Sequence, residues 1–570
     1  MTAVTPLRAV AAATLLSFAL RLWLAARIPS PFLFHDEGSY VAVGRALLGE
    51  APELFGPRYA PGYGVLVAPA QALLDPGGVH LAAKVLNAAA LAALVPVAYV
   101  LARRLGGLGP WLSLGVAVAG SAGAGLVVQA TMLLPEALLA LATAGTVVLL
   151  HRWLERPGAL AGLAAGSSAG FTYALHTRGA AVVGAVAVVA VAATALRRVD
   201  ARQGGVVLGA TVAVAAAGHL VGSWATDRLY PLATRGKEAG DLLEVFDDPL
   251  GVARTGAGHV WYLVFATGGL AALGAVAAAR TAWVRRRSGD GLAAGAVVLG
   301  LAASVLLSAL VHEGVAAGVV DRPDKLVYGR YLQQWAPVLV ALAPSLVVRW
   351  SRRAALVAVG ATGVGSLAVA ALLHRSYDAD VWSGPVAWHN IATLWLVDDV
   401  FGALWVVRTA VAFGVVVVAV LGAVVASGRP AAWAAPLALV GATGVIAGHA
   451  VTSDWAAPAS RAWAASHEVG PVLERLDRPV AVDVTAPTEL FHALNLQVWH
   501  PGVDVDLRFG APTTPVALRI DALADGPPTA GSRLVAVEQR LALGLWAVDP
   551  AVVRELREDG VTFLEPPGAP

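Results

Sequence analysis

Long apolar runs, separated by short polar or basic stretches, fill most of the chain. A membrane-spanning helix needs about 20 mainly apolar residues, and the pattern predicts about 13 such helices. One more apolar run, at residues 62–74, is too short to span and predicts an interfacial or re-entrant helix. The pattern therefore favours an all-α polytopic membrane protein. The expected spans are residues 7–27, 80–102, 108–129, 134–152, 158–176, 179–196, 204–226, 258–280, 291–312, 331–350, 354–373, 400–426 and 431–451.

The composition agrees with a membrane protein and excludes several classes of function. Of the 570 residues, 58% are hydrophobic and 14% are charged, whereas about a quarter of the residues in a soluble domain are charged. The formal net charge is only +2 and the basic residues are dispersed, so nucleic acid is not an expected partner. The chain has no cysteine, which excludes disulfides, thiolate metal sites and thiol nucleophiles.

The first apolar run is interpreted as a retained span rather than a cleaved signal peptide. It is too long for a signal sequence, contains Arg21, and lacks a small-residue cleavage site before Pro29 and Pro31. The heavy use of Ala, Gly and Val is typical of a high-GC bacterial genome. We therefore expect a multi-pass protein of the bacterial plasma membrane.

The basic residues between the expected spans predict the orientation. With the N-terminus in the cytoplasm, every loop assigned to the cytoplasm is short and basic, as the positive-inside rule requires. The loops assigned to the outside, at 28–79, 227–257, 313–330 and 374–399, are longer and more acidic. The cytoplasmic loops contain Arg103, Arg104, Arg152, Arg156, Arg197, Arg198, Arg202, Arg285, Arg286, Arg287, Arg352, Arg353 and Arg429.

The character of the sequence changes after residue 451. Segments rich in β-branched or aromatic residues and bounded by Gly, Pro or Asp predict strands. The sequence therefore predicts a transmembrane domain at 1–451 and a small α/β domain at 452–570, which an odd number of spans places outside the cell. This domain contains no recognised catalytic motif, and a lid or an acceptor-docking module is its expected role. The strands are expected at 478–484, 503–509, 533–538 and 545–549, with helices at 460–476, 487–496 and 550–558.

Two adjacent carboxylates follow the first expected span, in the outer loop. Asp36 and Glu37 stand between His35 and Tyr40, just before a short helical pattern that ends at Gly49. One interpretation is structural, with Asp36 as the helix N-cap and Glu37 as a favourable charge in the first turn. The other is catalytic, with Asp36 as a base at the membrane surface. Both can hold, because a cap fixes its side chain at a rigid helix start.

Glu136 is the second acidic candidate. It follows Pro135 where the third and fourth expected spans meet on the outer side. Both residues suit the first turn of a helix, so Glu136 can simply complement the helix dipole. Its predicted depth, on the same face as Asp36, also makes a shared cavity reasonable.

Four basic residues on the outer side run against the positive-inside trend. Arg58 precedes Tyr59 in the first outer loop, and Lys84 lies near the outer end of the second span. Arg178 marks the tight turn between spans five and six, and Arg330 precedes the tenth span. A lipid phosphate would explain cations here, because Arg binds phosphate with two donors and Lys binds it as a point charge. The alternative is snorkelling to outer headgroups or pairing with acids.

Other polar and aromatic features of the outer loops carry weaker signals. His312 is expected to be solvated in the loop with Glu313, and Trp382, Trp388 and Trp395 fit an interfacial aromatic belt at least as well as a sugar platform. The sequence contains no HExxH, GxSxG or Walker A motif, and no Gly-rich phosphate loop between a strand and a helix. A nucleotide sugar is therefore not the expected donor.

Three motifs in this order resemble the GT-C superfamily of polytopic glycosyltransferases, and within it the protein O-mannosyltransferases and the lipid A aminoarabinose transferases (families 39 and 83). The resemblance covers the whole chain as architecture, but as motif it covers only residues 29–180 and about 325–337. The chain departs from many bacterial relatives after Arg178, where Gly179 and Ala180 replace an expected Pro-Glu. The motifs are Asp36-Glu37 followed by Tyr40, Pro135-Glu136, and Gly329-Arg330-Tyr331.

The resemblance implies an inverting transfer, on the outer face, of a sugar from a polyprenyl-phosphate donor to a hydroxyl of an envelope glycan, lipid or protein. Asp36 would be the general base, Glu37 a supporting residue, and Glu136 would shape the acceptor side or hold Asp36. Lys84 resembles the phosphate-binding lysine of the family. No cofactor is required and no metal site is predicted, although Asp36, Glu136 and His35 are residue types that bind metals. The remaining donor-site candidates are Arg58, Tyr59, Arg178, Arg330, Tyr331, His35 and Tyr40.

Two other classes of function compete with the transferase. A transporter or flippase of lipid-linked sugars would use Asp36 and Glu136 as coupling carboxylates, but transporters usually show internal repeats and sites at the midplane. The sequence shows no repeat between its halves, and its acids are expected at one surface. A non-catalytic scaffold for wall assembly would tolerate Asn at position 36.

Overall fold

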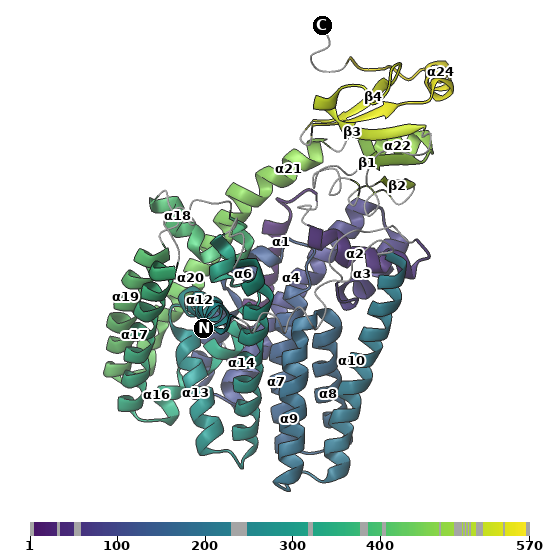
Figure 1. Cartoon of the computed structure of the whole chain (residues 1–570). Coiled ribbons are helices and arrows are strands. Elements are labelled where there is room, and N and C mark those ends of the chain that lie inside the picture. The colour runs from purple at the N-terminus through teal and green to yellow at the C-terminus, as the bar shows by residue number, and fades with distance from the viewer. Residues whose placement is uncertain are drawn as a thin grey trace.

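The computed structural model describes residues 5–30, 35–50, 59–229, 248–316, 323–376, 386–401, 406–466, 469–483, 493, 496, 500, 503–508, 517–539 and 542–565. These residues form a bundle of long helices with a small sheet domain at one end (Figure 1). The first half of the bundle contains α1 (Pro6–Ala25), α2 (His35–Leu47), α3 (Gly62–Leu73), α4 (Pro76–Arg104), α5 (Pro110–Ser121), α6 (Ala124–Gln129), α7 (Glu136–Glu155), α8 (Ala159–Leu175) and α9 (Ala180–Ala195). The second half contains α10 (Ala201–Leu229), α12 (Pro249–Ala266), α13 (Leu270–Val284), α14 (Gly289–Ala316), α15 (Ala336–Leu342), α16 (Ser345–Arg349), α17 (Arg352–Ser376), α18 (Trp395–Phe401), α19 (Val406–Ser427) and α20 (Ala434–Ala450).

Nine helices in the described ranges are long and apolar enough to cross a membrane, or ten if the pair α12–α13 is one span. The protein is a multi-pass membrane protein. The predicted number of about 13 spans is too high by this measure: two predicted spans are interrupted, and a third, at 158–176, folds as α8, which has only 17 residues. The run at 108–129 folds as α5 and α6, with Gly123 between them, and the run at 331–350 folds as α15 and α16. Pro344 precedes α16, and a proline cannot supply the N–H that would continue the preceding helix.

A sharp bend replaces the single helix predicted at 258–280. α12 and α13 meet at an angle of 108°. Gly268 and Gly269, which lie between them, have φ values of +56° and +82°. This left-handed backbone is favourable for glycine and strained for other residues. A hydropathy pattern counts apolar residues and does not detect such a reversal.

The segment between α1 and α4 carries two short helices at the end of the bundle nearest the sheet domain (Figure 1). α2 packs against α3, and α3 packs against α4. The helix predicted at 62–74 is therefore confirmed as α3. Asp36 lies at the start of α2, so this packing fixes where the first candidate base sits relative to the bundle.

The C-terminal sheet is mixed. Its five strands have the order β2-β1-β3-β5-β4, in which β1 pairs in parallel with β2 and β3, and β5 pairs antiparallel with β3 and β4. Four strands match the prediction, whereas β3 was not predicted although it is central. Two of its five residues, Arg519 and Asp521, are charged, which hides the strand signal. The strands are β1 (Val480–Asp483), β2 (Val505–Arg508), β3 (Leu518–Ala522), β4 (Arg533–Glu538) and β5 (Leu543–Ala547).

A continuous helical run joins the bundle to this domain. α20 passes through a π-helical segment, Val451–Ala456, into α21 (Ala457–Ser466), so the expected boundary after residue 451 lies inside helix. The predicted helices at 460–476 and 550–558 correspond to α21 with α22 (Val469–Leu476), and to α24 (Pro550–Glu558). Most of the segment predicted as helix at 487–496 lies outside the described residues.

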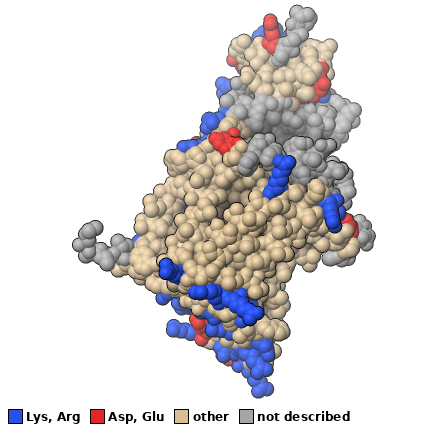
Figure 2. All heavy atoms as spheres, turned by 90° about the vertical axis from the view of Figure 1, so that its left-hand side faces the viewer, with Lys and Arg blue, Asp and Glu red and all other residues tan. Residues whose placement is uncertain are grey.

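The charges are distributed as the loop pattern predicts. Figure 2 shows Lys and Arg gathered at the end of the bundle opposite the sheet domain, and a broad band with few charges above them. An uncharged band of this kind fits the hydrocarbon region of a bilayer. The basic end corresponds to the loops assigned to the cytoplasm by the positive-inside rule.

Candidate active site

Asp36 lies in the first turn of α2, which begins at His35. Its carboxylate accepts hydrogen bonds from Tyr59 and Arg330, which belong to other segments of the chain. The interpretation of Asp36 as a helix N-cap is therefore wrong: the residue is inside the helix and its side chain faces the bundle. A rigid first turn still fixes its position.

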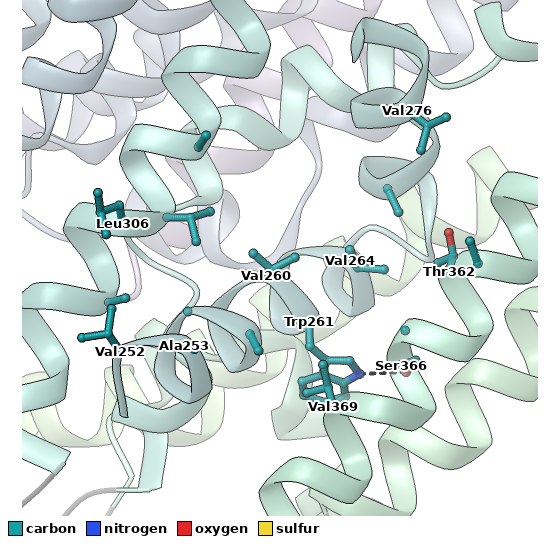
Figure 3. Close-up of a pocket in the computed structure, with 18 of the residues that line it drawn as sticks. Val252, Ala253, Val260, Trp261, Val264, Val276, Leu306, Thr362, Ser366 and Val369 are labelled. Carbon is teal, nitrogen blue, oxygen red and sulfur yellow. Dashed lines mark hydrogen bonds between the residues drawn. The ribbon is translucent and has the colours of Figure 1, made fainter. Parts of the chain in front are cut away.

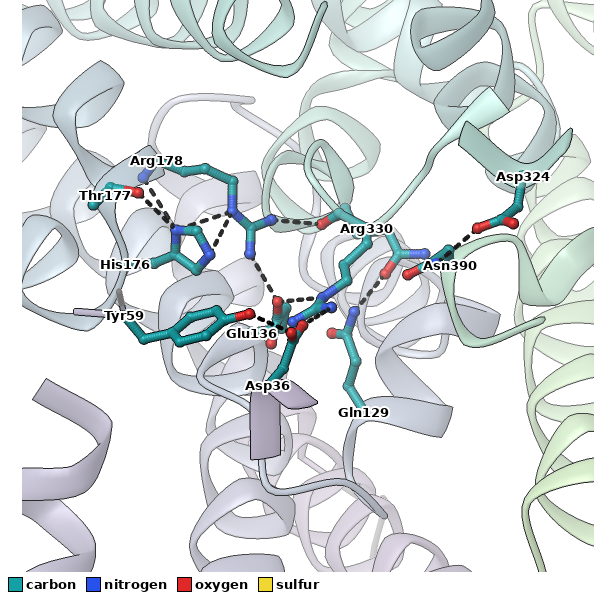
Figure 4. Close-up of polar contacts among 11 residues, drawn as sticks. Asp36, Tyr59, Gln129, Glu136, His176, Thr177, Arg178, Asp324, Arg330 and Asn390 are labelled. Atoms are coloured by element: carbon teal, nitrogen blue, oxygen red, sulfur yellow. Dashed lines mark hydrogen bonds and ion pairs between the residues drawn. The ribbon is translucent and has the colours of Figure 1, made fainter. Parts of the chain in front are cut away.

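Arg330 joins two carboxylates from distant parts of the chain (Figure 4). Its Nη1 donates to Oδ2 of Asp36 at 2.7 Å, and its Nε donates to Oε1 of Glu136 at 2.5 Å. The same oxygen of Glu136 accepts from Nη2 of Arg178 at 2.7 Å, and Nη1 of Arg178 donates to the backbone oxygen of Arg330 at 2.9 Å. We call Asp36, Glu136, Arg178 and Arg330 the charged cluster.

Three of the four side chains in the charged cluster are buried, and that of Asp36 is partly exposed. The side chains of Glu136, Arg178 and Arg330 are 3%, 5% and 6% exposed, whereas that of Asp36 is 25% exposed. Two acids and two arginines balance each other, which is the condition for placing four charges in a largely buried site. The exposed carboxylate is the group that a substrate can reach.

The positions of Glu136 and Arg178 are fixed by the backbone around them. Glu136 is the first residue of α7 and follows Pro135, as the sequence predicts. Arg178 lies in the single 3₁₀ turn η1 (Thr177–Gly179) between α8 and α9. A Cβ on Gly179 would lie 2.1 Å from the backbone carbon of Thr172, so only glycine allows this tight turn. The departure from the family pattern after Arg178 thus has a packing reason.

Arg330 is held by a second layer of polar contacts. The N–H of Gly329 donates to the backbone oxygen of Asn390 at 3.2 Å, and the Asn390 side chain donates to Asp324 at 2.9 Å. These partners belong to η6 (Trp388–Asn390) and η3 (Pro323–Val327). Nearby, Nε2 of Gln129 donates to Oε1 of Gln333 at 2.8 Å. The backbone that carries Arg330 is therefore fixed from several elements.

Aromatic rings cover one side of the charged cluster. The guanidinium of Arg178 lies 4.1 Å from the centre of the Tyr331 ring, a cation–π distance. Tyr331 also packs against His312, with ring centres 4.8 Å apart. The ring centres of Tyr40 and Tyr59 lie 4.6 Å apart. Apolar ring surface lowers the local dielectric and so strengthens the ion pairs beside it.

The electrostatics of Asp36 favour a carboxylate that is ionised at neutral pH. Burial raises the pKa of Asp36, but the charge of Arg330 and the hydrogen bonds from Tyr59 and Arg330 outweigh burial and hold it below its usual range. Burial and the neighbouring Asp36 raise the pKa of Tyr59 well above its usual range. Tyr59 therefore keeps its proton and donates to Asp36.

The remaining predicted site residues lie in different places. Oε1 of Glu37 accepts from the N–H of Leu133 at 2.7 Å, so Glu37 holds the segment that leads to α7. Lys84 is buried and its Nζ donates to the backbone oxygens of Ala25 and Ile28 at 2.9 and 2.8 Å. Lys84 therefore ties the end of α1 to α4 and, in the part of the chain that the structure describes, makes no direct contact with the charged cluster. Arg58 and the side chain of His35 lie outside the described residues.

Three residues of the site were not predicted. His176 accepts from the backbone N–H of Arg178 at 3.2 Å and from its Nε at 3.3 Å. His312 is buried, so the expectation that it is solvated is wrong. Tyr328 packs on His312 with ring centres 4.2 Å apart. His176 and Tyr328 each stand two residues before an arginine of the charged cluster, and that spacing was the available signal.

Two of the tryptophans expected in an aromatic belt, Trp388 and Trp395, pack against each other. Trp388 is buried, and it meets Trp395 edge to face with ring centres 4.9 Å apart. The belt interpretation is therefore wrong for Trp388, while Trp382 lies outside the described residues.

An apolar cavity of about 640 Å³ lies among α12, α13, α14 and α17 (Figure 3). Its lining is mostly aliphatic, and the indole N–H of Trp261 donates to Ser366 at 3.0 Å. Val260 lines the cavity, whereas the adjacent His259 is buried and packs near Tyr328, with ring centres 6.1 Å apart. α12 therefore separates this cavity from the aromatic rings beside the charged cluster.

Among the described residues, His151, Glu155 and Asp290 lie close enough together to hold a metal ion. They belong to α7 and α14, at the basic end of the bundle. Asp290 also accepts from Arg285 at 2.8 Å and from Arg349 at 3.3 Å. These arginines already neutralise the carboxylate, so the group acts as an ion-pair network between helices.

No family model and no curated protein matches the chain. Solved structures are similar over most of its length. ArnT from Cupriavidus metallidurans bound to undecaprenyl phosphate is 15% identical, with 94% of this chain and 98% of that chain covered and a TM-score of 0.48. The Archaeoglobus fulgidus oligosaccharyltransferase is 12% identical, with coverage of 95% and 68% and a TM-score of 0.42. The arabinosyltransferase EmbB from Mycobacterium smegmatis is 15% identical, with coverage of 79% and 41% and a TM-score of 0.41.

The identities are low and the TM-scores lie below 0.5. The assignment of a function therefore depends on the residues of the site themselves.

Proposed function

We propose that the protein is an integral-membrane glycosyltransferase of the GT-C type. It transfers a sugar from a polyprenyl-phosphate donor to an acceptor hydroxyl on the extracytoplasmic face, with inversion at the anomeric carbon. The observation that carries the proposal is the carboxylate of Asp36, which is partly exposed while two directed donors, Arg330 and Tyr59, hold it.

Asp36 has the properties that a general base in this reaction requires. It is ionised at neutral pH, and its orientation is fixed by one donor on each carboxylate oxygen. A base must reach the hydroxyl proton in the bound substrate, and Asp36 is the accessible member of the charged cluster. Base catalysis of this kind typically contributes about 10²–10⁴-fold to the rate.

The two arginines supply the positive charge for the leaving group. A phosphate leaves readily when cations stabilise the charge that develops on it. In the described part of the chain, Nη2 of Arg330 has no protein partner, while Nε and Nη1 hold the two carboxylates. We assign Nη2 to the donor phosphate, and Arg178 holds Arg330 in place from behind through Glu136.

The reaction balances without any further reagent. The acceptor oxygen forms a bond to the anomeric carbon, from the face opposite the phosphate. The bond between that carbon and the phosphate oxygen breaks, and its electron pair leaves with the polyprenyl phosphate. The hydroxyl proton moves to Oδ of Asp36, which later releases it to water.

The lipid part of the donor requires an apolar site beside the cluster. We assign the cavity among α12, α13, α14 and α17 to the polyprenyl chain, because its lining is apolar and it lies across α12 from the aromatic rings near Arg178. The ArnT structure contains undecaprenyl phosphate, a ligand of this class.

The test uses purified full-length protein in liposomes, polyprenyl-phosphate donors with radiolabelled sugars, and a bacterial envelope fraction as the source of acceptor. The proposal predicts release of polyprenyl phosphate together with a labelled glycoside of inverted anomeric configuration. Movement of intact donor across the bilayer without release of polyprenyl phosphate would instead identify a flippase. A product with retained configuration would overturn the role given to Asp36.

A further inference from the structure

A second, polar cavity is lined by Tyr59, the residue that donates to Asp36. Its volume is about 250 Å³, and it lies between α8, α10 and the segment that leads into α3. Tyr59 is shared: its ring lines this cavity and its hydroxyl donates to Asp36. The cavity is therefore one side chain away from the proposed base.

Three polar residues in the last turns of α10 face this cavity. His219, Ser223 and Asp227 are spaced by four residues, which places them on one face of the helix. α10 is a candidate membrane span, and ionisable groups in such a helix usually line a functional or water-filled site. Asp227 also stands near the C-terminal end of α10, where the helix dipole disfavours a carboxylate. The stability of the helix does not explain this stripe.

The chemistry of the described lining fits a neutral sugar better than the donor phosphate. The described residues that line the cavity include no lysine or arginine, so they offer nothing to balance a phosphate. They offer a carboxylate, an imidazole and hydroxyls, which bond to sugar hydroxyls, and two tyrosine rings, Tyr59 and Tyr173, on which a sugar ring can lie. The volume is below the roughly 300–1,000 Å³ of larger ligand pockets and suits a single sugar ring.

We infer that this cavity is the acceptor subsite and that it binds a neutral sugar residue of the acceptor, one ring from Asp36. The assignment as an acceptor subsite rests on the proposed function, whereas sugar binding at this place does not. The reactive hydroxyl of the acceptor extends past the edge of Tyr59 toward the carboxylate. The acceptor is thus a glycan or a glycolipid rather than an unmodified peptide.

The first test is binding, measured by saturation-transfer NMR on the full-length protein. The probes are methyl α-D-mannopyranoside and methyl α-D-arabinofuranoside, with inorganic phosphate as a competitor. Gly222→Val fills part of the cavity and presses on the lining residue Pro61, because a Cβ at Gly222 would lie 3.3 Å from its ring. Asp227→Asn removes a charge without changing volume. Gly209→Val is the matched control on α10, because a Cβ there meets nothing within 4 Å.

We expect at least one glycoside to bind the wild type and Gly209→Val alike, and to bind Gly222→Val and Asp227→Asn at least about tenfold more weakly. Phosphate should not compete. The inference is overturned if neither glycoside binds the wild type, if Gly222→Val binds as well as Gly209→Val, or if phosphate displaces the sugar.

Transfer kinetics then separate this inference from the proposed function. With a glycoside that serves as acceptor, Gly222→Val should raise the KM for the acceptor and leave the KM for the polyprenyl-phosphate donor unchanged. An unchanged acceptor KM beside active transfer would overturn the subsite and leave the function standing. Sugar binding without any transfer by the wild type would overturn the function and leave a sugar site.

Discussion

Replacing Arg330 by glutamine tests whether one side chain organises both carboxylates of the site. Arginine directs Nε to Glu136 and Nη1 to Asp36 from one planar group, and the shorter neutral amide of glutamine cannot reach both. Glu136 retains Arg178 after the change, while Asp36 retains only Tyr59. The substitution therefore affects the proposed base more than its buried partner.

The expected loss in the free energy of unfolding follows from the two lost contacts. Hydrogen bonds to charged groups contribute about 1.5–3 kcal/mol each, and the contact with Glu136 is buried at both ends, whereas Asp36 is 25% exposed. We expect a loss of about 3–4 kcal/mol in the free energy of unfolding, most of it from the Glu136 contact. Because the contact that we assign between Nη2 and the donor phosphate is also lost, kcat/KM should fall by about 10²–10³-fold.

The pH dependence gives the sharper signature. Arg330 lowers the pKa of Asp36, so its removal raises that pKa, and the base becomes protonated at a higher pH than in the wild type. In a plot of kcat/KM against pH, the acidic limb should therefore move to higher pH in Arg330→Gln. The control is Arg178→Gln, which loses a contact with Glu136 but none with Asp36. Its activity should fall without a comparable movement of the limb.

The assay is transfer of labelled sugar from a polyprenyl-phosphate donor, measured across acidic and neutral buffers for the three proteins. An acidic limb that stays in place in Arg330→Gln would refute the electrostatic link between Arg330 and the base. A limb that moves equally in both variants would show that general loss of structure, rather than the contact with Asp36, is responsible.

Two further predictions test the neighbours of the site. Tyr59→Phe removes a hydrogen-bond donor that lowers the pKa of Asp36. We expect kcat to fall about tenfold and the acidic limb of the pH profile to move to higher pH. Unchanged kinetics would show that the hydroxyl plays no part in the reaction. Gly365→Phe fills the apolar cavity, where a Cβ on Gly365 meets nothing within 4 Å, so the KM for long-chain donors should rise while that for a short-chain donor stays constant. Gly360→Phe, on the same helix and outside the cavity lining, is the control. Equal effects of these two substitutions would remove the lipid chain from this cavity.

The sequence singled out residues that the structure brings together, but it did not show how they touch. Asp36, Glu136, Arg178 and Arg330 were all selected, because charges near the outer ends of apolar runs need a reason. The sequence could not show that these residues contact one another, because Asp36 and Arg330 are 294 positions apart. Only the packing of α2 and α7 against the segment before α15 brings these residues together.

For Lys84, a sequence motif indicates the depth of the residue but not the direction of its side chain. Its depth in the bundle fits a phosphate-binding role, but the direction of its side chain depends on how α1 ends. The structure turns Nζ onto two backbone oxygens at that end. Likewise, hydropathy located the apolar segments but not the reversal at Gly268 and Gly269, because a turn of two residues hardly changes the average over a span.

The most direct test of the central claim is the rate of sugar transfer by Asp36→Asn. Asparagine has nearly the same shape. Its amide oxygen can still accept from Arg330 and its NH2 can donate to the hydroxyl oxygen of Tyr59, but it cannot take a proton. The control is Asp75→Asn, which removes a carboxylate that caps α4 outside the charged cluster. Binding of the polyprenyl-phosphate donor is measured for both variants. The account predicts unchanged donor binding by Asp36→Asn and a fall in transfer rate of at least about a hundredfold, with Asp75→Asn close to wild type. Transfer by Asp36→Asn at the wild-type rate would contradict it.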